Sequence, residues 1–131
     1  MLDVRTMRGT HMTRQEIFEH CLQQYGTKPD YPWQDWNAVL RHKENNKWYA
    51  VILEVDRKKL GLSEEGVVDV MNVKCDPVLS ASLRSQPGYF PAYHMNKDRW
   101  LSVLLSGPQP EDEIKGLIDM SFYATLAKKR N

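Results

Sequence analysis

The chain has 131 residues, of which 18 are Lys or Arg and 17 are Asp or Glu, with 41% hydrophobic residues. This length suits one α+β domain with a single core and is too short for two ordinary domains. The near-zero net charge argues against a strongly basic nucleic-acid-binding surface, and no apolar run is long enough to span a bilayer. The start also lacks a secretory pattern, so we expect a cytoplasmic protein that does not associate with membranes. We further expect it to be a monomer.

Residues 1–11 lack the periodicity of the remaining sequence, and His11-Met12 is typical of what a cloning site leaves behind. We interpret residues 1–11 as a vector-derived remnant and residues 12–131 as one domain. The two cysteines, Cys21 and Cys75, lack a metal-binding spacing and are expected to be buried free thiols.

The first expected helix begins after Thr13, because Thr13 and Glu16 have the spacing of a capping box, and it ends at Gly26. The segment 27–37 contains two prolines and several Asp and Asn residues, which favour a loop. We expect Trp33 and Trp36 in this loop to pack onto the sheet edge.

A hairpin is predicted next, with strands over 38–43 and 47–55 joined by a turn at Glu44-Asn45-Asn46. Apolar residues occupy both faces of the second strand, which indicates an interior strand covered on both sides or nearly so. The basic residues around the tip, together with His42, have the ordinary interpretation of a solvated turn and the alternative one of a phosphate-contacting wing.

A polar connection over 56–66, with room for one short helical turn, leads to a third strand over 67–73. Asp76-Pro77 predicts a helix start, and Pro87-Gly88 ends that helix. A fourth strand covers 100–105, and a last helix runs from Pro110 to about Ala127. The order α-β-β-β-α-β-α therefore predicts an α+β fold, with a mainly antiparallel sheet flanked by helices.

The segment 73–100 holds most of the chemically versatile residues, and its motifs N-V-K-C-D-P (72–77) and P-A-Y-H-M-N-K-D-R-W (91–100) resemble those of the MmcQ/YjbR family of small bacterial proteins. The similarity covers essentially residues 12–127. The resemblance implies a CyaY-like (frataxin-like) fold, with a sheet that has been compared to a double-wing DNA-binding domain. It therefore implies possible DNA binding by analogy of fold alone, and it supplies no catalytic residues.

Three hypotheses for function follow. The first is a nucleic-acid-binding module, in which basic side chains contact phosphates, Asn96 reads a base edge and Tyr93 stacks. Its candidate contacts are Arg41, Lys43, Lys47, Lys74, Arg84, His94, Asn96 and Lys97. The second is a protein- or small-ligand-interaction module that uses the 85–97 loop.

The third hypothesis is an enzyme that uses His94 with Asp76 or Asp98, or Cys75 as a nucleophile. We disfavour it because Asp76 already serves as a helix cap, because Cys75 has the pattern of a packed thiol, and because the sequence has no established catalytic motif. No cofactor or metal is expected. A frataxin-like iron role would need a carboxylate-rich helix face, and the first helix offers only Glu16 and Glu19.

Overall fold

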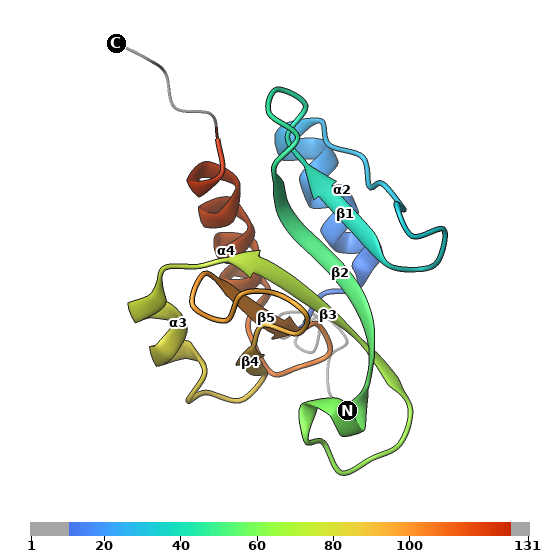
Figure 1. Ribbon diagram of the computed structural model, residues 1–131, viewed down its shortest axis with the longest axis vertical. Helices are drawn as coiled ribbons and strands as arrows, with labels where there is room; N and C mark the ends of the chain where they lie inside the picture. The colour runs from blue at the N-terminus through green and yellow to red at the C-terminus, as the bar shows by residue number, and fades with distance from the viewer. Residues whose placement is uncertain (1–10, 127–131) are drawn as a thin grey trace, which may run out of the picture.

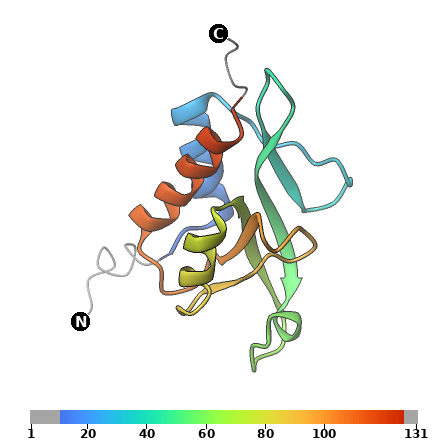
Figure 2. The same ribbon diagram turned by 60° about the vertical axis from the view of Figure 1, so that its left-hand side comes forward.

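The fold is built on one antiparallel sheet with its three α-helices on one side, as the computed structural model of residues 11–126 shows (Figures 1 and 2). The strand order is β1-β2-β3-β5-β4, and every neighbouring pair is antiparallel. The strands are β1 (Ala38–Arg41), β2 (Trp48–Asp56), β3 (Val67–Lys74), β4 (Tyr89–Pro91) and β5 (Trp100–Leu104). The helices are α2 (Arg14–Tyr25), α3 (Pro77–Leu83) and α4 (Glu111–Ala124), with a short 3-10 helix η1 (Arg57–Leu60). The α+β fold class is confirmed.

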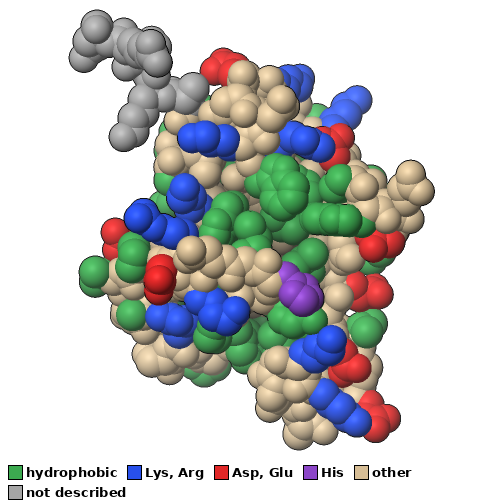
Figure 3. Space-filling model, in the orientation of Figure 1, with side chains coloured by type: hydrophobic (Ala, Val, Ile, Leu, Met, Phe, Trp, Pro, Cys, Tyr) green, Lys and Arg blue, Asp and Glu red, His purple; other side chains and the backbone are tan. Residues whose placement is uncertain are grey.

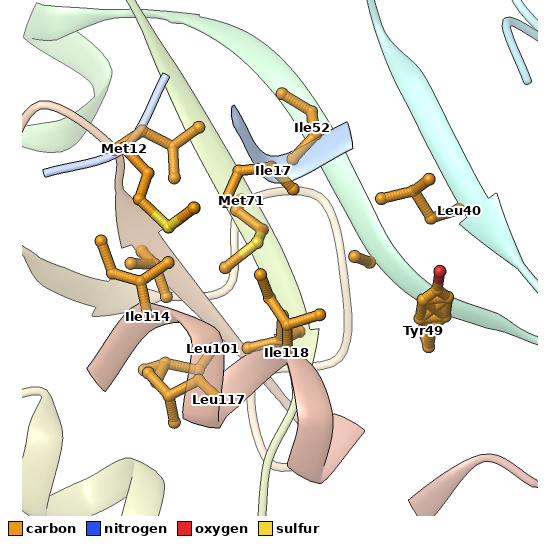
Figure 4. Packing of buried hydrophobic residues seen from close by; sticks show 14 of the residues in the cluster. Met12, Ile17, Leu40, Tyr49, Ile52, Met71, Leu101, Ile114, Leu117 and Ile118 are labelled. Atoms are coloured by element: carbon orange, nitrogen blue, oxygen red, sulfur yellow. The ribbon is translucent and has the colours of Figure 1, made fainter. Parts of the chain in front are cut away.

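The main core lies between the sheet and the helices. Because side chains alternate along a strand, each strand sends every second residue to this face. Figure 4 shows Ile52 and Met71 from the sheet meeting Ile17 from α2 and Ile118 from α4. These four side chains are fully buried. Within residues 11–126, no helix is both long and apolar enough to cross a membrane.

The helix ends follow the local sequence signals. Thr13 and Glu16 form the reciprocal capping box at the start of α2, and Gly26 ends that helix in the left-handed conformation, with φ of 68°. The Asp76 side chain accepts hydrogen bonds from the backbone N–H groups at the start of α3. These predicted caps and the predicted helical turn at η1 are confirmed.

Several features differ from the sequence-based expectation. The helix α3 ends at Leu83, before the predicted stop at Pro87-Gly88. Residues Tyr89–Pro91 form an additional edge strand, β4, on β5. The hairpin turn is longer than predicted: β1 ends at Arg41, and His42 is buried instead of standing at a solvated tip. Trp33 and Trp36 are 47% and 57% exposed. Trp33 packs against Trp48 of β2, whereas Trp36 lies against Arg14 of α2 instead of the sheet edge. The proposed remnant falls almost entirely outside the described residues, because only its last residue, His11, belongs to them.

The opposite face of the sheet is covered only in part. A small second core of Val55, Val68, Val70 and Leu104 lies there beneath the segment that contains η1 and beneath the 92–99 loop. Farther along β2, toward the hairpin, no helix covers the sheet within residues 11–126 (Figure 1). We call this side the open face.

Candidate functional site

The open face contains a groove between two loops, with the sheet as its floor. We call it the Trp groove. One wall comes from the 26–37 loop, the floor from β2, and the other wall from the 92–99 loop, and its volume is about 360 Å³. The lining residues are Trp33, Asp35, Asn37, Trp48, Val51, Leu53, His94 and Met95. Figure 3 shows hydrophobic side chains gathered in the middle of this face, with a histidine at their border and Lys and Arg side chains around them.

Two indole rings form a corner of the Trp groove. The ring centroids of Trp33 and Trp48 are 5.7 Å apart, and the planes make an angle of 81°. Trp48 is half-buried at the start of β2, whereas almost half of the Trp33 surface is open to solvent. The edge-to-face contact fixes Trp33 while leaving aromatic surface available to a ligand.

The 26–37 loop is tied to the sheet by polar side chains. The Asn37 side chain accepts a 2.8 Å hydrogen bond from the Glu54 backbone N–H, and Asp35 in turn accepts bonds from the backbone and side-chain N–H groups of Asn37, at 2.8 and 3.2 Å. This chain of bonds links Asp35, which lines the groove, to β2.

The same end of the loop is also held by a buried arginine. The guanidinium of Arg14 makes two hydrogen bonds with Asp69, at 3.0 and 2.7 Å, and donates to the carbonyl of Trp36. It also lies over the Trp36 ring, 4.5 Å from its centroid. Trp36 therefore has a cationic partner from the protein itself.

The 92–99 loop is anchored from below by two buried polar residues that face each other across β3 and β5. Asn72 and Ser102 are fully buried partners in the strand register and are hydrogen-bonded to each other. Asn72 donates to the carbonyl of Tyr93 at 2.8 Å, and Ser102 accepts from the Tyr93 backbone N–H at 2.9 Å. Because all of these groups are partnered below the loop, the backbone entering His94 has a fixed position.

Each wall of the Trp groove contains a non-glycine residue in the left-handed backbone region. Gln34 has φ of 58° and His94 has φ of 60°. Such conformations are unfavourable for ordinary residues and concentrate at ligand-binding and functional sites. The His94 ring is exposed and lies against Tyr93, with the centroids 3.9 Å apart.

Two of the predicted nucleic-acid contacts, Asn96 and Lys97, make hydrogen bonds within their own loop. The Asn96 side chain accepts from the backbone N–H groups of Asp98 and Arg99, which shapes the turn before β5. Lys97 donates from Nζ to the carbonyl of Ala92 at 3.1 Å. These bonds favour a structural role for both residues.

The remaining predicted contacts are dispersed. Arg41 pairs with Asp30 at 2.7 Å, whereas Lys43 and Lys47 are exposed near the hairpin tip. Lys74 lines a separate pocket between β3, α3 and α4, and Arg84 caps the end of α3. His94 is the predicted contact that lines the Trp groove. Sequence reasoning missed Trp48, Asn72 and Ser102 as site residues. For Asn72 and Ser102, the available signal was a polar residue flanked by apolar residues in each of two strands.

The cysteines and His42 belong to the interior. Burial raises the pKa of the Cys21 thiol to about 11 and also raises the pKa of Cys75. Both thiols are free, as the sequence predicted. Burial lowers the pKa of His42, whose Nε2 lies 2.8 Å from the hydroxyl oxygen of Thr125 near the end of α4. Within residues 11–126, no three His, Cys, Asp or Glu side chains are placed to share a metal ion.

Comparison with known proteins establishes the family. The family model YjbR matches residues 22–124. The chain belongs to the YjbR family. The YjbR relative from Escherichia coli (strain K12) is 28% identical over 116 residues, which cover 88% of each chain. The Bacillus subtilis (strain 168) protein YyaQ is 46% identical over 116 residues, which cover 87% of this chain and 98% of YyaQ. Both relatives are described as uncharacterized proteins.

A solved structure supports the fold of this YjbR family member. A crystal structure of a Pseudomonas syringae protein superposes with a TM-score of 0.85 at 44% identity, covering 88% of this chain and all of that one. The predicted MmcQ/YjbR membership and the antiparallel α+β architecture are thereby confirmed.

Proposed function

We propose that this YjbR family protein is a non-enzymatic binding module whose small ligand occupies the Trp groove. The observation that carries the proposal is the convergence of three distant chain segments on one apolar hollow, with two indole rings as its corner. Ligand pockets are typically concave and mostly apolar, with a few polar groups that fix orientation. Here Asp35, Asn37 and His94 supply those groups.

The anchoring of both walls supports a binding role. A groove formed by two free loops would lose affinity through the entropy of ordering them. In this protein the Asn72–Ser102 pair holds one wall and the Asn37 hydrogen bond to β2 holds the other. The groove is therefore largely formed before a ligand arrives.

The arrangement of the potentially reactive groups is the reason for proposing a non-enzymatic role. The Cys75 thiol is buried with a raised pKa, which disfavours the nucleophilic thiolate. Asp76 is used as the α3 cap, and His94 lines the Trp groove, whereas Cys75 and Asp76 line a different pocket. The separation of His94 from Cys75 and Asp76 supports a non-enzymatic role.

Fragment binding measured by saturation-transfer NMR tests the proposal. A set of small aromatic and aliphatic fragments should bind the wild-type protein, and Trp33→Leu should abolish most of that binding because it removes one wall of the corner. Trp36→Leu is the matched control, since it changes the same residue type in the same loop outside the groove lining. Equal binding by both variants would contradict the proposal.

A second candidate function, nucleic-acid binding, is favoured by the basic side chains around the apolar patch in Figure 3. Lys43 and Lys47 are exposed and make no recorded ion pair with another residue of 11–126. Exposed rings beside such cations can stack bases while the cations contact phosphates. Titration with single-stranded and duplex DNA at two salt concentrations tests this function. Binding that weakens with salt supports it, and absence of binding at low salt rejects it.

A further inference from the structure

The two exposed tryptophans of the 26–37 loop differ in one respect that indicates the chemistry of the ligand. The Trp36 ring already carries the Arg14 guanidinium at 4.5 Å. Trp33 has a comparable exposure, yet no Lys or Arg among residues 11–126 lies over its ring or over that of Trp48. The corner of the Trp groove therefore has aromatic faces without a cation.

The charge of the groove lining complements a cation. Asp35 is the one formally charged residue type in the lining, which contains neither Lys nor Arg. Two hydrogen bonds from Asn37 hold the Asp35 carboxylate in place. The basic side chains of Figure 3 surround the patch without lining the groove. A carboxylate beside two perpendicular indole rings attracts a cation both by charge and by the negative ring faces.

The remaining lining suits a cation that carries methyl groups. Val51, Leu53 and Met95 provide apolar surface next to the indole corner. A bare ammonium would lose hydration there without receiving enough hydrogen bonds, whereas a methylated ammonium is weakly hydrated and packs well. The volume of about 360 Å³ is at the small end for ligand pockets, which favours a free small molecule over a long peptide.

We propose that the Trp groove binds a small soluble molecule bearing a methylated ammonium group, held between Trp33 and Trp48 with Asp35 as its counter-charge. This inference rests on the proposed function, because it names the ligand class of the same groove.

Choline and its uncharged isostere 3,3-dimethylbutan-1-ol are the probes for the test. They have nearly the same shape, so a difference between them reports the charge alone. NMR titration of the wild-type protein should move the indole signals of Trp33 and Trp48, with choline binding at least about threefold more tightly than the alcohol. Asp35→Asn should lower the ratio of choline affinity to alcohol affinity by about twofold to fivefold, because it removes the counter-charge and keeps the side-chain shape. Asp98→Asn removes an exposed charge outside the groove lining and should change neither.

The outcomes separate this inference from the proposed function. If choline and the alcohol bind equally, or if neither binds while neutral fragments do, the cation inference is overturned and the apolar binding groove stands. If no fragment or probe moves the Trp33 and Trp48 signals, both are overturned. A short peptide containing trimethyl-lysine is the last probe. If the protein binds this peptide more than about tenfold more tightly than choline, the proposal that the ligand is a free small molecule is overturned.

Discussion

The two faces of the sheet are built differently although they share the same five strands. The helix-covered face buries a continuous core, including fully buried Ile17, Met71 and Ile118. The open face has a four-residue second core and, beside it, the Trp groove with its half-exposed Trp33. The contrast teaches that most of the folding free energy comes from one face, which leaves the other free to present side chains for recognition.

Polar groups also serve the two faces differently. Near the hairpin, Ser121 on α4 donates to the Tyr49 carbonyl and accepts from the Lys74 backbone N–H, which attaches the helix to the sheet. On the open face, the Asn72–Ser102 pair attaches a loop instead. We therefore expect substitutions on the two faces to separate stability from binding.

The largest effect is expected for Ile118→Ala, which removes a fully buried side chain from the helix-covered core. The free energy of unfolding should fall by about 2–5 kcal/mol, from the lost burial and the cavity left behind. Urea denaturation monitored by circular dichroism measures it. The fraction of the protein that stays folded should bind fragments as the wild type does. A decrease in the free energy of unfolding of less than about 1 kcal/mol would show that this face is not the main source of stability.

A smaller loss is expected for Ser102→Ala, which leaves Asn72 with an unpaired buried oxygen and Tyr93 with an unpaired backbone N–H. The cost should be about 1–3 kcal/mol of unfolding free energy. Unlike Ile118→Ala, this change should also weaken binding in the groove, because the backbone entering His94 loses its anchor. Full binding affinity with normal His94 and Met95 NMR signals would show that the pair does not position this wall.

The next effect is on the free energy of unfolding at mildly acidic pH, and it comes from His42. Burial lowers its native pKa below the ordinary value of 6.5, so the unfolded chain takes up the proton first. The free energy of unfolding should therefore fall as the pH drops from 6.5 toward the lower native pKa. His42→Gln should flatten this part of the profile, and His94→Gln on the open face should keep it. Urea titrations between about pH 7.5 and 5.5 measure the difference; identical profiles for all three proteins would contradict it.

The smallest effects on stability are expected for the two exposed tryptophans. Trp36→Leu loses the contact with Arg14 and should cost about 0.5–1 kcal/mol. Trp33→Leu should change the free energy of unfolding by less than about 0.5 kcal/mol, as surface substitutions usually do. Trp33→Leu should nevertheless remove most of the fragment binding in the Trp groove. A large destabilisation by Trp33→Leu would instead identify Trp33 as a structural residue.

Local signals in the sequence predicted the three α-helices and four of the five strands. Thr13 with Glu16 and Asp76 with Pro77 are signals contained within four residues, so they need no knowledge of the rest of the fold. The short strand β4 was not predicted because Tyr89–Pro91 becomes a strand only by pairing with β5. A three-residue edge strand containing a proline gives almost no periodic signal.

The site was harder to predict than the fold because it depends on contacts between distant segments. The sequence drew attention to the 85–97 loop, and His94 of that segment does line the Trp groove. The other wall depends on how Trp33 meets Trp48, which only the path of the 26–37 loop determines. Likewise, the Asn72–Ser102 contact depends on the register between β3 and β5. Asn96 and Lys97 are exposed but make hydrogen bonds within their own loop, a contact that the polar run by itself did not indicate.

The most direct test of the open face as the recognition surface is to follow the indole NMR signals of the four tryptophans while a fragment that binds the protein is titrated in. Trp33 and Trp48 line the groove, whereas Trp36 and Trp100 do not. The account predicts that the Trp33 and Trp48 signals shift together along one saturable curve while those of Trp36 and Trp100 stay in place. Saturable shifts confined to Trp36 or Trp100, with Trp33 and Trp48 unmoved, would contradict it.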